Sequence, residues 1–391
     1  MTLDEFVTLG GWPGRRFRAR PSMPCTAWQL LSNPRMARRI VICCATCLVV
    51  LALSACVPPQ GRHPKGTVAK TAAAPADDLP PPTDTLTKIT AFTAYVPLDK
   101  EAPGVIGKLG RYRVSAGQNL LDIARQGGLG FRELRDANPR IDEWEPKAGS
   151  VLTIPTRWIL PSPNRYQGLV INIPEFRLYL FPVDTKQGER EPIMTWPVGI
   201  GAEYAQSPVG SFNVKSKDEN PTWVVPDSIY SKMEKPQHVV PPGPDNPLGA
   251  YRIRLDVDVY AIHGTNDPWT VGRLTTHGCI RLYPEDIEYL YKIVDRGTPG
   301  EFVYQPIKVG ERKGHIFVEV HQDVYQQIPD MQELARSLVA KVGLTDRIDP
   351  GLLQAAVKAQ LGYPIDITRD APKAESDADD VGGDGHQVAD R

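Results

Sequence analysis

The stretch IHGTNDPWTVGRLTTHGCIRLYPEDIEYLYKIV, residues 262–294, leads from a strand pattern through a polar loop into a helix pattern. Residues 257–262 alternate in the way that predicts a strand ending near Ile262. A loop rich in Gly, Asn, Asp and Pro follows. Pro284 suits the first turn of an amphipathic helix. The apolar residues on one face of that helix are Ile287, Leu290, Tyr291 and Val294.

Strand patterns also dominate the chain before this stretch. LVINI (residues 169–173) and FRLYLF (176–181) are rich in β-formers, and Pro174-Glu175 between them suits a tight turn. SPVGSFNV (207–214) and residues 251–255 continue the pattern. We therefore predict a β-dominated domain over residues 165–306, a sandwich or barrel with few helices.

Cys279 is isolated, because the other five of the six cysteines fall within the first 56 residues. A free thiol has a pKa near 8.5, so a nucleophilic cysteine needs a base or a cation beside it. His263, at the strand end, can fold back onto the sulfur, whereas His277 is only two residues away and is less well placed. Gly278 leaves backbone N–H groups open to a carbonyl oxygen. Two other readings are an inert buried thiol and a zinc site of His263, His277 and Cys279, although no close-spaced ligand pair supports zinc.

The motifs around these residues resemble the L,D-transpeptidase family, which has a YkuD-type catalytic domain. The resemblance is carried by residues 263–265 (HGT), 276–282 (THGCIRL), 199–201 (GIG), 207–212 (SPVGSF) and 246–249 (NPLG). It makes residues 165–306 the catalytic domain of an acyl-transfer enzyme that needs no cofactor and no metal.

The resemblance also implies a role for each matching residue. Cys279 would attack the bond between diaminopimelate and D-alanine in a tetrapeptide stem, form a thioester and pass the acyl group to an amine. His263 would be the general base, with its ring oriented by the Gly264 carbonyl. N–H groups around Gly278 and Cys279 would bind the oxyanion.

The remaining residues of the motif would shape the pocket and bind substrate. Thr276, where serine is more usual, and His277 would shape the pocket, and Arg281 would meet a stem carboxylate. The acceptor could be a diaminopimelate amine, a lysine of an outer-membrane lipoprotein or a free D-amino acid. Two alternatives stay open: a hydrolase in which water resolves the thioester, and a non-catalytic tether that only binds the wall.

Residues 111–156 predict a small module of strand, helix, helix and strand. Residues 112–114 and 151–154 read as short strands, and Asn119 can cap the first helix. The order resembles a LysM module, which binds the glycan of peptidoglycan. Gln118-Asn119 replaces the acidic residue and hydroxyl usual in that family, and a scaffold that binds nothing is the alternative.

The N-terminal region has the pattern of a targeting sequence. Residues 1–55 form a leader with a signal peptide, and translation could start at Met36. The sequence LSAC ending at Cys56 resembles a lipobox, so Cys56 would carry lipid; an ordinary signal peptide is the alternative. Residues 56–90 read as a Pro/Ala-rich tether. Val57 is not an inner-membrane retention signal, so we expect an outer-membrane anchor and a periplasmic body.

The back of the chain divides into two parts. Residues 307–368 form a C-terminal extension with one strand pattern and two helix patterns, and residues 369–391 form an acidic, Gly-rich tail that we expect to be disordered. The whole chain has 45 basic and 46 acidic side chains. That balance excludes the basic excess typical of a nucleic-acid binder.

Overall fold

The computed structural model describes residues 79–95, 103–183, 190–231, 236–257 and 259–370. All of them belong to the unit Ala69–Arg391. The predicted leader, the lipidation at Cys56 and nearly all of the acidic tail lie outside these residues. Within them, no helix has both the length and the apolar character needed to cross a membrane.

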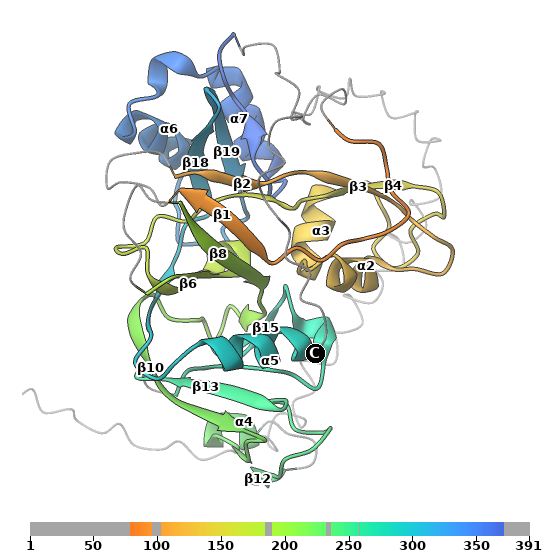
Figure 1. Ribbon diagram of the computed structural model, residues 1–391, viewed down its shortest axis with the longest axis vertical. Helices are drawn as coiled ribbons and strands as arrows, with labels where there is room; N and C mark the ends of the chain where they lie inside the picture. Colours follow the sequence, from red (N-terminus) through yellow and green to blue (C-terminus); the bar gives the residue numbers. More distant parts are fainter. Residues whose placement is uncertain (1–78, 96–102, 184–189, 232–235, 258, 371–391) are drawn as a thin grey trace, which may run out of the picture. The chain divides into compact units, whose positions relative to one another are not determined.

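A nine-stranded sheet organises the chain and confirms the β-dominated class (Figure 1). Neighbouring strands are antiparallel, except that β17 pairs with β6 and β16 with β14 in parallel. In spatial order the strands are β1 (Ala91–Tyr95), β8 (Arg190–Pro197), β7 (Arg177–Phe181), β6 (Gly168–Asn172), β17 (Pro299–Val303), β10 (Gly210–Glu219), β13 (Tyr251–Leu255), β14 (Ala261–His263) and β16 (Ile280–Arg281).

The sheet carries a hydrophobic core on each face. Along β6, Leu169 and Ile171 enter one core while Val170 enters the other, as the alternation of side chains in a strand requires. The first core contains Ile262 of β14 and Ile280 of β16. The second contains Leu120 and Leu134 from two helices of the preceding module. Both faces of the sheet are therefore covered.

That module has the predicted order of strand, helix, helix and strand: β3 (Gly110–Arg113), α2 (Leu120–Gln126), α3 (Phe131–Ala137) and β4 (Val151–Ile154). β3 pairs with β4. Asn119 is confirmed as the N-cap of α2, because its side chain accepts from the Asp122 N–H at 2.9 Å. The strands β2 (Val105–Gly107) and β5 (Arg157–Ile159) pair with each other on either side of it. Glycan binding by this module stays a prediction.

A buried ion pair joins the module to the sheet. Arg177 on β7 donates from Nε and from one terminal nitrogen to the two carboxylate oxygens of Glu133 on α3, at 2.8 and 2.9 Å. Arg177 also donates to Thr195 and lies over the ring of Trp158. Because both charges are almost fully buried, each depends on the other for its solvation.

Residues 79–90, the last part of the predicted tether, make contacts with the folded chain. Thr83 forms a bridge with Tyr112, Lys88 Nζ lies 2.5 Å from Asp286 Oδ1, and β1 pairs with β8. Leu86 packs on the second core. Residues 79–90 therefore contact both the module and the helix α5 (Pro284–Ile293). Their proline-rich composition hides these contacts in the sequence.

The C-terminal extension forms its own small sheet and two helices, drawn in blue in Figure 1. The three strands are β18 (Ile307–Arg312), β19 (His315–Val320) and β20 (Ile365–Asp366), and the helices are α6 (Met331–Lys341) and α7 (Pro350–Ala359). Lys308 on β18 is buried between Glu175, in the turn that joins β6 to β7, and Glu319 of β19. The extension therefore has a charged contact with the turn between β6 and β7.

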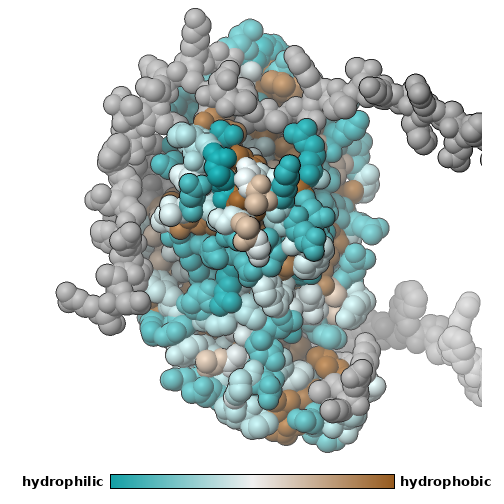
Figure 2. All heavy atoms as spheres, turned by 90° about the vertical axis from the view of Figure 1, so that its right-hand side faces the viewer, coloured by the Kyte–Doolittle hydropathy of each residue, from teal (hydrophilic) through white to brown (hydrophobic). Residues whose placement is uncertain are grey.

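Short elements complete the described chain: η2 (Ile173–Glu175), β9 (Ile200–Gly201), β11 (Trp223–Val224), α4 (Asp227–Tyr230), β12 (Val239–Val240), η3 (Pro268–Thr270), β15 (Leu274–Thr276) and η4 (Thr345–Arg347). The described surface seen in Figure 2 is mainly hydrophilic, with apolar side chains in small groups.

Candidate active site

The parallel pairing of β14 with β16 sets the geometry around Cys279. Ile262 pairs with Ile280, and His263 pairs with Arg281. Both isoleucines are fully buried in the first core. Because side chains alternate along a strand, His263 and Arg281 project from the opposite face. Cys279 lies directly before β16. The charge of Arg281 acts on both the thiol and the His263 ring, so Arg281 lies near both side chains.

His263 is held as a neutral imidazole. Its side chain is 3% exposed, and Nδ1 lies 2.6 Å from the Gly264 carbonyl. A carbonyl only accepts, so Nδ1 carries the hydrogen and Nε2 keeps its lone pair. Burial, reinforced by the charges of Arg281 and Arg252, lowers the pKa of His263 to about 3. The ring is therefore a proton acceptor at neutral pH, oriented as the family resemblance implies.

Cys279 is half-buried, with Sγ 3.9 Å from the Val259 carbonyl. Burial raises the pKa of the thiol, and a hydrogen bond from the Ala261 backbone and the charge of Arg281 oppose the rise only in part. Cys279 and His263 therefore rest as a neutral thiol and a neutral imidazole.

The loop before Cys279 is braced by Thr276. The Thr276 hydroxyl donates to the Cys279 carbonyl at 2.6 Å and accepts the Gly278 N–H at 3.1 Å. The Gly278 N–H therefore already has an acceptor in Thr276, and its binding of an oxyanion stays a prediction. Gly278 has φ +102°, and a Cβ there would meet Tyr260 Cε1 at 2.4 Å. Both facts require glycine.

His277 and Arg281 lie on different parts of the site. His277 is exposed, and its ring meets the edge of the Tyr204 ring at 5.8 Å between centroids. It lies at the surface together with Tyr204, which is 73% exposed. The Arg281 Nε is buried without a hydrogen-bond partner in the described chain. This donor is therefore left unsatisfied within the described chain.

Arg252 is a further cation that the sequence did not single out. It pairs with His263 across β13 and β14, so the order across three strands is Arg252, His263, Arg281. Its Nε donates to Asp218 at 2.9 Å. Only the strand register reveals this row, since Arg252 and Arg281 are far apart in sequence.

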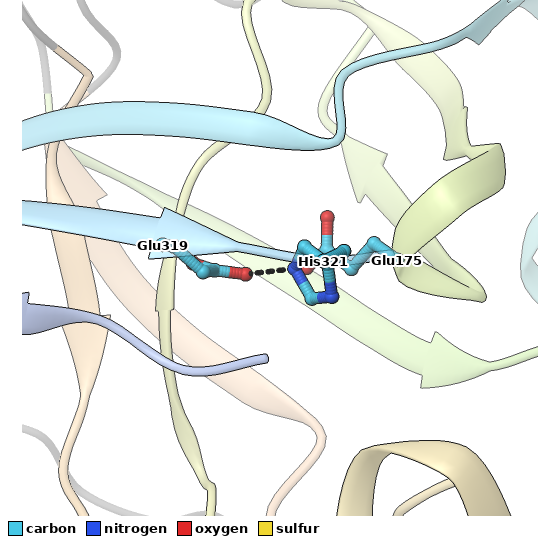
Figure 3. Close-up of side chains that lie close together, drawn as sticks. All are labelled: Glu175, Glu319 and His321. Atoms are coloured by element: carbon cyan, nitrogen blue, oxygen red, sulfur yellow. Dashed lines mark hydrogen bonds and ion pairs between the residues drawn. The ribbon is translucent and has the colours of Figure 1, made fainter. Parts of the chain in front are cut away.

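Glu175, Glu319 and His321 are the described residues whose ligand atoms lie close enough to hold a metal ion (Figure 3). His321 hydrogen-bonds Glu319 at 2.7 Å. The Lys308 ammonium lies 2.6 Å from Glu175 and 2.9 Å from Glu319, and so supplies the cation that the two carboxylates need. These three side chains and Lys308 therefore form a buried ion network. The zinc alternative does not form such a group in the described chain, since His277 lies out at Tyr204.

Comparison with known proteins identifies the family of the chain. The family model described as the L,D-transpeptidase catalytic domain (YkuD) matches residues 166–309. Probable L,D-transpeptidase YcfS of Escherichia coli (strain K12) is 36% identical over 267 residues, which cover 65% of this chain and 81% of that protein. Two others from the same strain, Probable L,D-transpeptidase YbiS and Probable L,D-transpeptidase ErfK/SrfK, are 32% and 34% identical, each with 71% of this chain and 92% of the relative covered. The chain therefore belongs to the L,D-transpeptidase family and is a transpeptidase enzyme.

Proposed function

We propose that this enzyme acts on peptidoglycan through a thioester on Cys279, with His263 as the base. The observation that carries the proposal is the pairing of His263 with Arg281 across β14 and β16, with Cys279 directly before β16. The charge of Arg281 acts on both the thiol and the imidazole. The neutral states of the thiol and the imidazole suit proton transfer from one to the other.

The reaction then follows from these two side chains. His263 Nε2 takes the thiol proton as Sγ attacks the carbonyl carbon of the bond between diaminopimelate and D-alanine. The Cys279 N–H donates to the resulting oxyanion. The imidazolium gives its proton to the leaving amine of D-alanine, and a thioester remains. An amine acceptor then loses a proton to His263, attacks the thioester and releases the thiol.

Arginine side chains on both sides of His263 are suited to the carboxylates of the stem. Arg281 has a donor without a partner in the described chain, and a guanidinium binds a carboxylate in two places. Arg252 shares the face, although Asp218 offsets part of its charge. We assign the main substrate contact to Arg281 for this reason.

We also propose a place for the enzyme in the cell envelope. The lipobox resemblance at Cys56 supports a lipid anchor, and Val57 favours the outer membrane with the body in the periplasm. The order of elements from β3 to β4 supports glycan binding by a LysM module. An outer-membrane lipoprotein in this compartment would be one possible amine acceptor.

The test is product analysis with diaminopimelate-type muropeptides. A soluble chain starting at residue 57 keeps residues 79–90, which contact the folded body. Amine-linked products that Cys279→Ala abolishes support transfer, whereas tripeptide and free D-alanine alone identify hydrolysis. Unchanged muropeptides from both proteins would favour the wall-binding tether. Intact mass after incubation with a carbapenem gives a second readout, because an adduct absent from Cys279→Ala reports a reactive thiol.

A further inference from the structure

The peptide bond between Gly278 and Cys279 is held by its carbonyl. The Ser207 hydroxyl donates to the Gly278 oxygen at 3.0 Å, and Ser207 is buried. A trans peptide is planar, with its C=O and N–H pointing in opposite directions. The bond from Ser207 therefore also fixes the direction of the Cys279 N–H, the proposed oxyanion donor.

Ser207 is held in turn by a tyrosine from another part of the chain. The Tyr325 hydroxyl accepts the Ser207 N–H at 3.1 Å and donates to the Gly201 carbonyl at 2.7 Å. The Gly201 N–H donates to the Ser207 hydroxyl at 3.0 Å. These bonds close a ring of Gly201, Ser207 and Tyr325, in which each polar group has one defined orientation.

Tyr325 comes from outside the catalytic domain matched at residues 166–309. It lies between β19 and α6 of the C-terminal extension, and its side chain is buried in the same core as Ile262 and Ile280. Its N–H donates to the Tyr304 hydroxyl at 2.9 Å, and the two rings stack at 5.9 Å. Tyr325 is therefore anchored at both its backbone and its ring.

We propose that Tyr325 is a positioning residue for transfer: through Ser207 it aligns the Cys279 N–H with the oxyanion. The C-terminal extension would thus complete the active site. The alternative is a purely structural role, in which the buried Tyr325 side chain contributes to stability alone. The inference rests on the proposed role of Cys279. Its test distinguishes a failure of the inference from a failure of the proposed function.

The experiment compares Tyr325→Phe with the unchanged chain. Removing one oxyanion donor outright costs about 10²–10³-fold in kcat, so loosening it should cost about 10-fold, with KM changed less than about 2-fold. Alkylation of Cys279 by iodoacetamide forms no oxyanion, so its rate should stay within about 2-fold. Tyr363→Phe, in the core of the extension, is the matched control and should leave both rates unchanged.

Two further variants keep the test decisive. Ser207→Ala should show the same split between kcat and alkylation, and Ser207→Ala with Tyr325→Phe should lose little more than Ser207→Ala alone, because the two residues act in series. The inference is overturned if Tyr325→Phe keeps full kcat, or if kcat and alkylation fall together. If Cys279→Ala still transfers, the proposed function fails instead, whatever Tyr325→Phe does.

Discussion

Gly278→Ala should disable the enzyme while leaving the chain folded. The added Cβ would lie 2.4 Å from Tyr260 Cε1, and φ there is +102°. Ordinary contact needs at least about 3.4 Å, so the ring or the loop must move by about 1 Å. A positive φ on a residue with a Cβ adds roughly 1–3 kcal/mol of strain.

The expected loss follows from where that movement falls. Gly278 immediately precedes Cys279, and its carbonyl and N–H are both held, by Ser207 and Thr276. A displacement of about 1 Å at a reacting group costs about 10²-fold in rate. We therefore expect kcat for release of D-alanine to fall about 100-fold.

The assay measures D-alanine release and the midpoint of urea unfolding for the same preparations. Gly297→Ala is the matched control, since Gly297 also has a positive φ (+87°) but open space at its Cβ. It should lose stability and keep its activity. Tyr260→Ala combined with Gly278→Ala relieves the clash but not the strain, and should recover part of the activity. Gly278→Ala with more than half of the normal kcat would refute this account of the loop.

Three further predictions concern buried charge and protonation. Arg177→Met should lower the free energy of unfolding by about 3–5 kcal/mol, because it leaves the buried Glu133 carboxylate without its partner. Adding Glu133→Leu should restore most of the lost free energy, as measured by urea titration. A loss below about 1 kcal/mol for Arg177→Met alone would contradict the pairing. Since the pKa of His263 is lowered to about 3, the unfolded chain binds an extra proton between about pH 6.5 and 3, so stability falls as the pH drops through that window. His263→Gln should flatten this fall by about one proton, and an unchanged slope would argue against a buried neutral ring. Alkylation of Cys279 should rise with pH along a single curve whose midpoint lies above the ordinary thiol value, because burial raises that pKa; a plateau near pH 6 would instead reveal a resting thiolate.

Local patterns predicted β6, β7, β10 and β13 and the helix that begins at Pro284, but not β1, β8 or β17 of the same sheet. Apolar alternation and helix starts are short-range signals, so residues such as Asn119 could be read directly. The site's supports could not be read in this way. The pairing of Arg252 with His263 depends on register, and the contact of Tyr325 with Ser207 joins segments that no periodicity relates.

The use of the Gly278 N–H also escaped prediction for a physical reason. A glycine in a loop indicates freedom of the backbone, but not which acceptor its N–H finds. Here the hydroxyl of Thr276 lies within reach and takes it. The side chain that the motif substitutes for serine is therefore a structural brace, and a hydroxyl is the part of it that matters.

The shared core beneath β6 and β7 limits how this chain can be recombined. Leu120 and Leu134 of the helical module pack with Val170 and Tyr179 of the sheet, and Glu133, the carboxylate paired with Arg177, lies across that boundary. The module therefore cannot be replaced as an independently folding domain. A chimera carrying a foreign module would leave an uncompensated cation and bare aliphatic surface, so heat should melt the natural module and sheet in one calorimetric transition.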